Sequence, residues 1–178
     1  MTTQKNKGLV HLYTGDGKGK TTAAAGLLVR AAGAGLRGLF CQFLKGQDTS
    51  ELAPLQKLGI EVLRTDEVKK FIPFMDENEK KACVKSHNLC YNKMKTLLLS
   101  GEYDIVVLDE VTAAVSLGLI SLADLLALLA QRPETVEVVL TGRNAPEELR
   151  AAADYVSDIR CLRHPYEKGI LARKGIEY

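Results

Sequence analysis

The stretch most able to do chemistry is a glycine-rich run between an apolar segment and an alanine-rich one. Its residues are Thr14, Gly15, Asp16, Gly17, Lys18, Gly19, Lys20, Thr21 and Thr22. The glycines let backbone N–H groups point into one concavity, and the start of the following helix adds its positive dipole end. Lys20 can then contact phosphates and the Thr21 hydroxyl can reach Mg²⁺. The run predicts a P-loop that binds a nucleoside triphosphate or a similar ligand.

The match to the P-loop pattern GxxxxGK[ST] has one departure. Gly19, Lys20 and Thr21 occupy the second glycine, lysine and hydroxyl positions, but Thr14 stands where the first glycine is expected. The alternative interpretation is a chance match in an ordinary loop. The apolar segment before the run and the alanine-rich segment after it favour the P-loop.

A second candidate element is an apolar segment that ends in two acids, Asp109 and Glu110. Unpaired carboxylates in a low-dielectric environment are unfavourable, so acids at the end of a buried strand indicate a partner. Mg²⁺ or Mn²⁺, bound directly or through water, is such a partner. The alternative is a pair of acids in a surface turn.

Another apolar segment ends in Thr141, Gly142 and Arg143. Ligands of open α/β sheets bind at the carboxyl ends of the strands, so these residues are predicted to line the same cleft. Arg143 is a candidate for holding a phosphate, a carboxylate or an amide oxygen of a substrate. A helix-capping or ion-pair role is the open alternative.

These candidates need a scaffold, and short β-rich segments alternate with helical ones along the chain. The alternation is typical of a parallel sheet covered on both faces. It predicts an α/β, RecA-like three-layer P-loop fold, in one domain of residues 1–178, with a mainly parallel sheet of about six strands. The predicted strands are Leu9–Thr14, Gly38–Phe43, Ile60–Leu63, Asp104–Asp109, Val136–Thr141 and Ile159–Arg163.

Helix signals lie between these strands. An alanine-rich helix over Lys20–Ala34 is predicted to end at Gly35. The patterns Asp76-x-x-Glu79 and Ser121-x-x-Asp124 indicate N-terminal caps. A further helix is expected from Asn144, with Pro146 in its first turn.

Composition limits the class of protein. The chain has 178 residues, 46% hydrophobic, and a net charge of +2, so no strong global field favours nucleic acid or an anionic membrane. We find no apolar run that could span a bilayer and no signal-peptide pattern, so a cytoplasmic protein is expected. The four cysteines are widely spaced, which favours reduced thiols in a core. Cys161 and His164 alone are too few ligands for a metal site.

The segment Glu67–Asp76 breaks the alternation of strands and helices. It holds Phe71 and Phe74, two of the four phenylalanines in the chain. One interpretation is a hydrophobic plug beneath a loop. The other is an apolar wall for a large ligand.

Several separate stretches, from about Leu9 to Tyr178, together resemble the P-loop class of ATP:corrinoid adenosyltransferases. The P-loop with Thr14 and the C-terminal tail are the most specific of them. The stretches are Thr14-Gly-Asp-Gly-Lys-Gly-Lys-Thr-Thr-Ala-Ala, Gln42-Phe-Leu-Lys-Gly, Val107-Leu-Asp-Glu-Val-Thr, Arg132-Pro, Leu140-Thr-Gly-Arg and His164-Pro-Tyr-Glu-Lys-Gly-Ile-Leu-Ala-Arg-Lys-Gly-Ile-Glu-Tyr.

The resemblance implies that Co(I) of cob(I)alamin or cobinamide attacks the ribose 5′-carbon of ATP and expels triphosphate. It implies that the nucleotide is reversed relative to other P-loop proteins, which accounts for Thr14. Lys20, the loop amides and Mg²⁺ held by Thr21 and by Asp109 or Glu110 would stabilise the leaving group. No general base is needed, in agreement with the absence of an obvious His or Cys nucleophile arrangement.

The resemblance also implies apolar and aromatic side chains that displace the lower axial ligand of cobalt. Phe71 and Phe74 stand where those aromatics are expected, although the chain has no tryptophan and its spacing around Pro73 differs. A flavoprotein is the implied candidate reductant, and a homodimer is the implied assembly. Some members close the site with a longer N-terminal helix. Here only Met1–Gly8 precede the first strand, so either another loop covers the corrinoid or the site is more open.

Two other classes of function remain open at this stage. A RecA-like P-loop ATPase could act on nucleic acid or a protein partner, with Glu110 positioning water, although the balanced charge provides no basic groove. A carrier that delivers a corrinoid or nucleotide without chemistry is the third class. For the transferase, the corrinoid is either complete cobalamin or an incomplete precursor, and the role is either synthesis or salvage.

Overall fold

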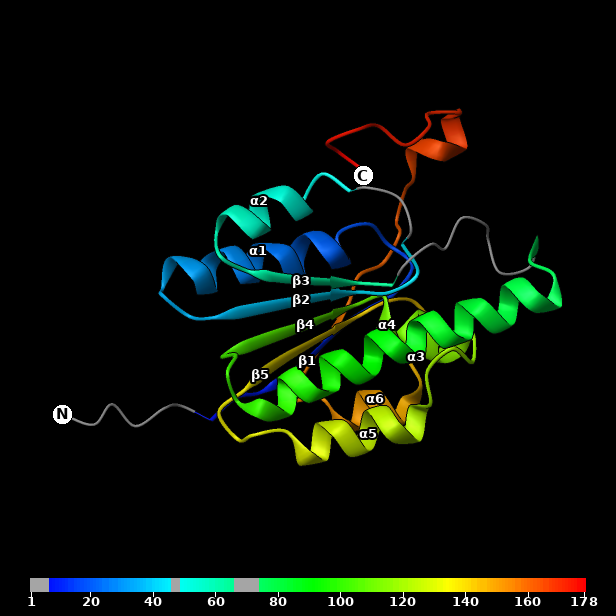
Figure 1. The fold of residues 1–178 in the computed structure, drawn as a ribbon. Coiled ribbons are helices and arrows are strands. Elements are labelled where there is room, and N and C mark those ends of the chain that lie inside the picture. Colours follow the sequence, from blue (N-terminus) through cyan, green and yellow to red (C-terminus); the bar gives the residue numbers. More distant parts are fainter. Residues whose placement is uncertain (1–6, 46–48, 66–73) are drawn as a thin grey trace.

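A computed structural model describes residues 7–45, 49–65 and 74–178 and shows an α/β fold, as predicted. Helices cover both faces of one sheet (Figure 1). The strands are β1 (Val10–Thr14), β2 (Gly38–Gln42), β3 (Glu61–Arg64), β4 (Ile105–Asp109), β5 (Glu137–Thr141) and β6 (Tyr155–Asp158). The helices are α1 (Lys20–Gly33), α2 (Leu52–Lys57), α3 (Glu77–Ser100), α4 (Val111–Ser116), α5 (Leu122–Gln131), α6 (Glu147–Ala152) and the 3₁₀ helix η2 (Pro165–Lys168).

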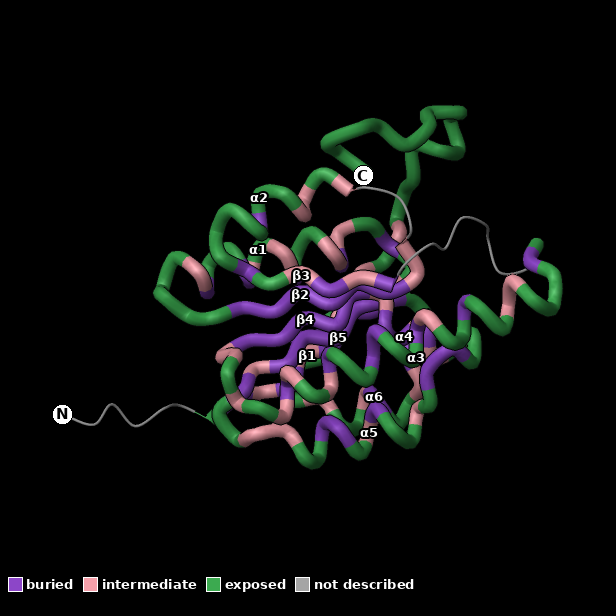
Figure 2. Tube along the Cα trace, in the orientation of Figure 1, coloured by how far each residue is buried: buried purple, intermediate pink, exposed green. Residues whose placement is uncertain are grey.

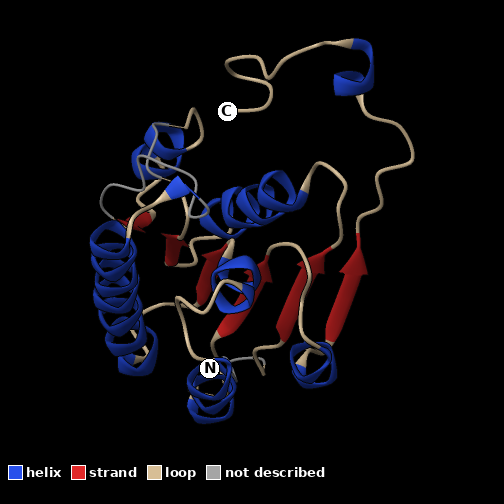
Figure 3. Cartoon of the chain, turned by 90° about the vertical axis from the view of Figure 1, so that its right-hand side faces the viewer, coloured by secondary structure: helices blue, strands red, loops and turns tan. Residues whose placement is uncertain are grey.

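The six strands lie in the order β3-β2-β4-β5-β1-β6, and every neighbouring pair is parallel. The carboxyl ends of all strands therefore meet at one edge of the sheet, the upper edge in Figure 3. One strand, β5, separates β1, which leads into the glycine-rich run, from β4, which ends at Asp109. In the register of β2 and β4, Gln42 lies opposite Asp109.

Two hydrophobic clusters hold the three layers together. The smaller one joins α1 and α2 to one face of the sheet through Leu28, Leu55 and Phe40. The larger one joins the other face to α3, α4, α5 and α6, with Met94 and Leu125 among its members. β2 and β4 are buried along their whole length, as Figure 2 shows, because helices cover both of their faces.

Local signals in the sequence correctly located most elements. Asp76 and Glu79 form a reciprocal capping box at the start of α3, and the Ser121 hydroxyl accepts a hydrogen bond from the N–H of Asp124. Pro146 is the N-cap of α6 rather than a first-turn residue. The helices α2 and α4 have six residues each and were not expected from the sequence.

The sixth strand is not where the sequence placed it. The prediction of a strand over Ile159–Arg163 is wrong, because β6 covers Tyr155–Asp158. β6 is the edge strand beside β1, and all four of its residues are exposed. An exposed edge strand lacks the apolar pattern of a buried strand, and the stretch that follows β6 fits that pattern better.

Candidate functional site

A pocket of about 560 Å³ lies at the carboxyl edge of the sheet and is lined in part by the start of α1. Its volume is in the range of small-molecule and cofactor sites. Predicted site residues that line it are Asp16, Gly17, Lys18, Gly19, Lys20, Thr21, Thr22, Glu110 and Arg143. Lys45, Ser50, Glu51, His164 and the last residues of the chain line it as well.

Gly17 and Gly19 are required in the loop for different steric reasons. A Cβ on Gly17 would lie 2.7 Å from the carbonyl oxygen of Ile159, and the Gly17 N–H donates to that same oxygen over 2.7 Å. Gly19 has open space around it but a φ of +123°, a conformation that favours glycine. The loop thus turns sharply at Gly19 and is held against the chain that follows β6.

Lys20 is 6% exposed and bends back over its own loop. Its Nζ donates to the carbonyl oxygens of Gly15 and Gly17 over 2.7 and 2.8 Å. The loop carbonyls thus satisfy the ammonium, which accounts for the burial of this lysine. Burial lowers the pKa of Lys20. The negative charge of Glu110 is the largest effect that opposes this shift. The ammonium therefore lies against the loop that is predicted to bind phosphate.

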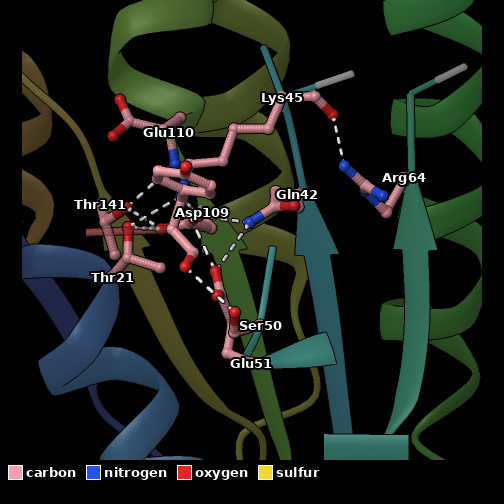
Figure 4. A network of polar contacts seen from close by, with 10 residues as sticks. Thr21, Gln42, Lys45, Ser50, Glu51, Arg64, Asp109, Glu110 and Thr141 are labelled. Carbon is pink, nitrogen blue, oxygen red and sulfur yellow. Dashed lines mark hydrogen bonds and ion pairs between the residues drawn. The ribbon is translucent and has the colours of Figure 1, made fainter. Parts of the chain in front are cut away.

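Asp109, at the end of β4, is fully buried and anchors the polar network drawn in Figure 4. Its Oδ1 accepts from the hydroxyls of Thr21 over 2.8 Å and of Thr141 over 2.7 Å. Its Oδ2 accepts from Gln42 and from Lys45, each over 3.2 Å. We call these five residues the Asp109 network. Four separate segments of the chain meet at one carboxylate, and three of the predicted residues, Thr21, Asp109 and Thr141, are brought together.

Glu110 lies next to this network but is held differently. It has a φ of 59°, and its backbone N–H donates to Thr141 Oγ1 over 2.9 Å. Its carboxylate lines the pocket and points away from Asp109 in Figure 4. Burial raises the pKa of Glu110, and the neighbouring charge of Asp109 adds to the shift. The αL conformation, uncommon for a non-glycine residue, aims this acid at the ligand side.

The other predicted residues of this region have distinct positions. Arg143 lines the pocket, and its side chain forms no ion pair with a carboxylate of the described residues. Thr14 is fully buried as the last residue of β1, and neither it nor Gly15 is among the lining residues. Their part in nucleotide binding stays a prediction.

The C-terminal tail, residues 159–178, leaves β6 and returns to the pocket (Figure 1). The Asp16 carboxylate accepts from the Cys161 N–H over 3.1 Å, and this bond is the main reason that the pKa of Asp16 is lowered. Lys18 and Glu177 form an ion pair at 2.8 Å, and Ser50 Oγ donates to the Tyr178 carbonyl oxygen over 3.0 Å. The tail therefore lies over the glycine-rich loop, and Glu177 and Tyr178 line the pocket.

Sequence reasoning missed Lys45, Glu51, Glu177 and Tyr178 as lining residues. Lys45, Glu177 and Tyr178 lie in stretches that carry the family resemblance, but the contacts of Glu177 and Tyr178 join segments far apart in the chain. No local pattern therefore placed these residues at the site. Lys45 had one available signal, since it follows closely on a buried strand that ends in the polar Gln42.

The structure tests the prediction for Phe74 but not the one for Phe71. Phe71 lies outside the described residues. Phe74 is 78% exposed, while the adjacent Met75 is buried. The interpretation of a hydrophobic plug is therefore wrong for Phe74, and an apolar wall for a ligand stays a prediction.

Three of the four cysteines lie in the core. Cys41, Cys83 and Cys90 are free and buried, as expected, but Cys161 is partly exposed outside the core. Within residues 7–45, 49–65 and 74–178, no three side chains of His, Cys, Asp or Glu are grouped as metal ligands. Among the same residues, no helix combines the length and apolar character needed to cross a membrane.

Comparison with known proteins decides the family. A sequence model described as ATP:corrinoid adenosyltransferase BtuR/CobO/CobP matches residues 6–178. The chain belongs to this family. The corrinoid adenosyltransferase of Escherichia coli strain K12 is 32% identical over 178 residues, covering 98% of this chain and 88% of that protein. Corrinoid adenosyltransferase CobA of Salmonella typhimurium is also 32% identical, with the same coverage. A corrinoid adenosyltransferase of Sinorhizobium sp is 31% identical over 97% of this chain and 81% of its own length.

Membership in the corrinoid adenosyltransferase family supports a transferase with ATP and a corrinoid as substrates. The P-loop, the Asp109 network and the C-terminal tail lie within the matched residues.

Proposed function

We propose that this chain transfers the 5′-deoxyadenosyl group of ATP to Co(I) of a corrinoid and releases triphosphate. The observation that carries the proposal is the pocket lined by Lys20 and Thr21, with Asp109 buried behind Thr21, in a chain of the corrinoid adenosyltransferase family. The electron pair of Co(I) forms the Co–C bond to the ribose 5′-carbon. The C5′–O bond breaks, and its electron pair leaves with the triphosphate.

In this proposal the residues of the P-loop stabilise the triphosphate leaving group. Lys20 would exchange the Gly15 and Gly17 carbonyls for phosphate oxygens, and Arg143 adds a second positive charge at the pocket wall. Gly19, Thr21 and Thr22 bring backbone N–H groups to the start of α1. These groups are fixed before the bond breaks, so they stabilise developing negative charge without reorganisation.

The site fits a hard divalent cation. Thr21 Oγ1 and the carboxylates of Asp109 and Glu110 are oxygen donors, and the buried Asp109 already attracts a positively charged group, the Lys45 ammonium. Mg²⁺ or Mn²⁺, when bound, would neutralise charge on the phosphates. Thr21 and Asp109, with Glu110, are the residues that would hold it.

The corrinoid side of the site rests on Phe71 and Phe74. The high exposure of Phe74 supports contact with a ligand, because a large apolar side chain left in water gains by covering a flat apolar surface. In this proposal at least one of the two packs against the lower face of the corrin and keeps cobalt four-coordinate. Supply of electrons by a flavoprotein, assembly as a homodimer and a role in adenosylcobalamin synthesis or salvage belong to the same proposal.

The test is anaerobic incubation with ATP, Mg²⁺ and chemically reduced cobalamin. The light-sensitive adenosyl product is followed by its spectrum, and triphosphate is measured in the same sample. One triphosphate should appear per adenosylated corrinoid. Phosphate release without corrinoid, stimulated by DNA or RNA, would instead indicate a P-loop ATPase. Binding of both ligands without product would indicate a carrier.

A further inference from the structure

Lys45 lies in the pocket at the place where a divalent cation is expected. Its Nζ is 3.2 Å from Asp109 Oδ2 and 3.3 Å from Thr21 Oγ1. Glu51 Oε1 lies at 4.0 Å from the same nitrogen. Figure 4 shows the long side chain of Lys45 reaching into the Asp109 network from the end of β2.

The direction of the hydrogen bonds makes this position informative. The Thr21 hydroxyl gives its proton to Asp109 Oδ1, so its oxygen offers only lone pairs on the other side. An ammonium has donors and no acceptor, and Lys45 Nζ donates to that oxygen and to Asp109 Oδ2. These are the atoms that a hard cation would approach. The ammonium therefore occupies the same electrostatic position as a metal ion.

The backbone around Lys45 is fixed by three anchors from other elements. The Phe43 N–H donates to the Asp109 carbonyl oxygen over 3.0 Å. The Leu44 N–H donates to His87 Nε2 over 3.3 Å, and Leu44 has a φ of 61°, uncommon for a leucine. Arg64 donates to the Lys45 carbonyl oxygen over 2.9 Å. A strained and anchored backbone places this lysine, so its contact with Asp109 is a built feature rather than a chance surface pair.

The charges that face the ammonium support an exchange of ions. Asp109 is fully buried, whereas the Lys45 side chain is 29% exposed on the pocket side. A buried carboxylate is unfavourable without a positive partner or hydrogen-bond donors, but a partly exposed lysine can leave toward solvent or ligand. Lys45 itself lines the pocket, so phosphate oxygens would be within its reach.

We propose that the Lys45 ammonium holds the cation position between Thr21 and Asp109 in the nucleotide-free protein and moves to the phosphates when metal and nucleotide bind. This inference rests on the proposed binding of a nucleotide–metal complex. It makes metal binding weak without nucleotide, because the ion must displace a bound ammonium. It also adds a second lysine to the phosphate-binding groups, besides Lys20.

The experiment uses the full chain without ATP or corrinoid. Free Mn²⁺ is titrated and followed by its electron paramagnetic resonance signal in wild type, Lys45→Met and Lys18→Met. Lys18→Met is the matched control, since it removes the same charge from the pocket wall without touching Asp109. Lys45→Met should bind Mn²⁺ about tenfold more tightly or better, because a like charge at the ion position is gone. The control should stay close to wild type.

A second measurement, of the affinity for ATP, should change in the opposite direction. At saturating Mn²⁺, ATP should bind Lys45→Met more weakly than wild type, because the phosphate contact that Lys45 makes once metal and nucleotide are bound is lost. If Lys45→Met is too unstable to titrate, its melting temperature with and without Mn²⁺ is the readout, since a ligand of the folded state raises it. Mn²⁺ should then stabilise this variant far more than wild type.

The proposal is overturned if Lys45→Met binds Mn²⁺ no more tightly than wild type, or if Lys18→Met gains as much. The first result would make Lys45 an ordinary structural ion pair, and the second would make the effect one of overall charge. Because the Mn²⁺ titration contains neither ATP nor corrinoid, its outcome can be read even if no adenosyl product is ever detected.

Discussion

The floor and the cover of the pocket are built in opposite ways. The floor is the Asp109 network, in which a fully buried carboxylate receives four hydrogen bonds from α1, β2, β5 and the loop after β2. The cover is the C-terminal tail, where residues are exposed apart from Ile159 and Cys161, which are partly buried. Figure 2 shows the contrast as a purple sheet edge below a green tail.

The difference implies a division of labour. A buried carboxylate that accepts several hydrogen bonds is held in place and can keep its donors positioned for a reaction. Exposed ion pairs contribute little to stability and are screened by salt. The floor should therefore determine the rate of the chemical step, and the cover should determine how easily ligands enter and leave. The following predictions test that division, starting with the largest effect.

Lys20→Ala should reduce adenosylation by about a hundredfold or more, because it removes one preorganised charge from the leaving group. Lys18→Ala, which removes a neighbouring lysine that pairs with the tail, should change kcat much less. Steady-state kinetics with prereduced cobalamin compare the two. Near-normal activity of Lys20→Ala would remove the P-loop from the mechanism.

Substitutions of the adjacent acids Asp109 and Glu110 should have different effects on the stability of the fold. Asp109→Asn should lower the free energy of unfolding by about 2 kcal/mol or more, because it disturbs a buried charge with four partners. Glu110→Gln should be at least as stable as wild type at pH 7. The pKa of Glu110 is raised in the folded state, so its contribution is largest below the unfolded pKa and declines as pH rises through the folded pKa. Urea unfolding at pH 7 measures both.

Glu110→Gln should instead raise the Mg²⁺ concentration needed for half-maximal rate, because an anionic oxygen at the proposed ion site becomes neutral with little change of volume. Corrinoid affinity should change less. A Mg²⁺ titration of the rate measures the effect. An unchanged requirement would assign the metal to Thr21 and Asp109, with water completing the shell.

Phe74→Ala tests whether an exposed residue outside both regions takes part in the reaction. Turnover from Co(II)alamin should fall by about tenfold, a loss expected for one large apolar contact, and turnover from prereduced Co(I) much less. Leu89→Ala is the control, because Leu89 is also apolar and exposed but lies on α3. Electron paramagnetic resonance of Co(II)alamin with ATP should show a four-coordinate signal in wild type. If Phe71→Ala, Phe74→Ala and the double variant all keep it, neither phenylalanine lies under the corrin.

The same contrast explains which parts of the molecule could be predicted from the sequence. The P-loop, the capping box at Asp76 and the buried strands are local patterns, and their physical causes lie within a few residues. The Asp109 network could be predicted only in part, because Lys45 meets Asp109 through the side-by-side placement of β2 and β4. The tail could not be placed, since its few contacts with Lys18 and Ser50 span most of the chain.

Glu177→Gln should have the smallest effect and should act on the cover alone. The variant loses the ion pair with Lys18 and weakens the contact with Arg173, so KM for ATP should change by about two- to threefold while kcat is retained. Glu147→Gln removes an exposed pair with Arg150 on α6, away from the pocket, and should leave KM unchanged.

The dependence of KM on salt and pH distinguishes this last prediction from the others. Hydrogen bonds from Arg173 and Lys18 lower the pKa of Glu177 to about 2. A depressed carboxylate pKa means that the contact is present above the unfolded value near 4.5 and is lost only as pH falls toward about 2. Between pH 6 and 9 the difference in KM between wild type and Glu177→Gln should therefore be constant. Raising the ionic strength should shrink it, because screening weakens exposed pairs. A difference that resists salt, or a matching loss of kcat, would show that the tail belongs to the catalytic floor rather than to a removable cover.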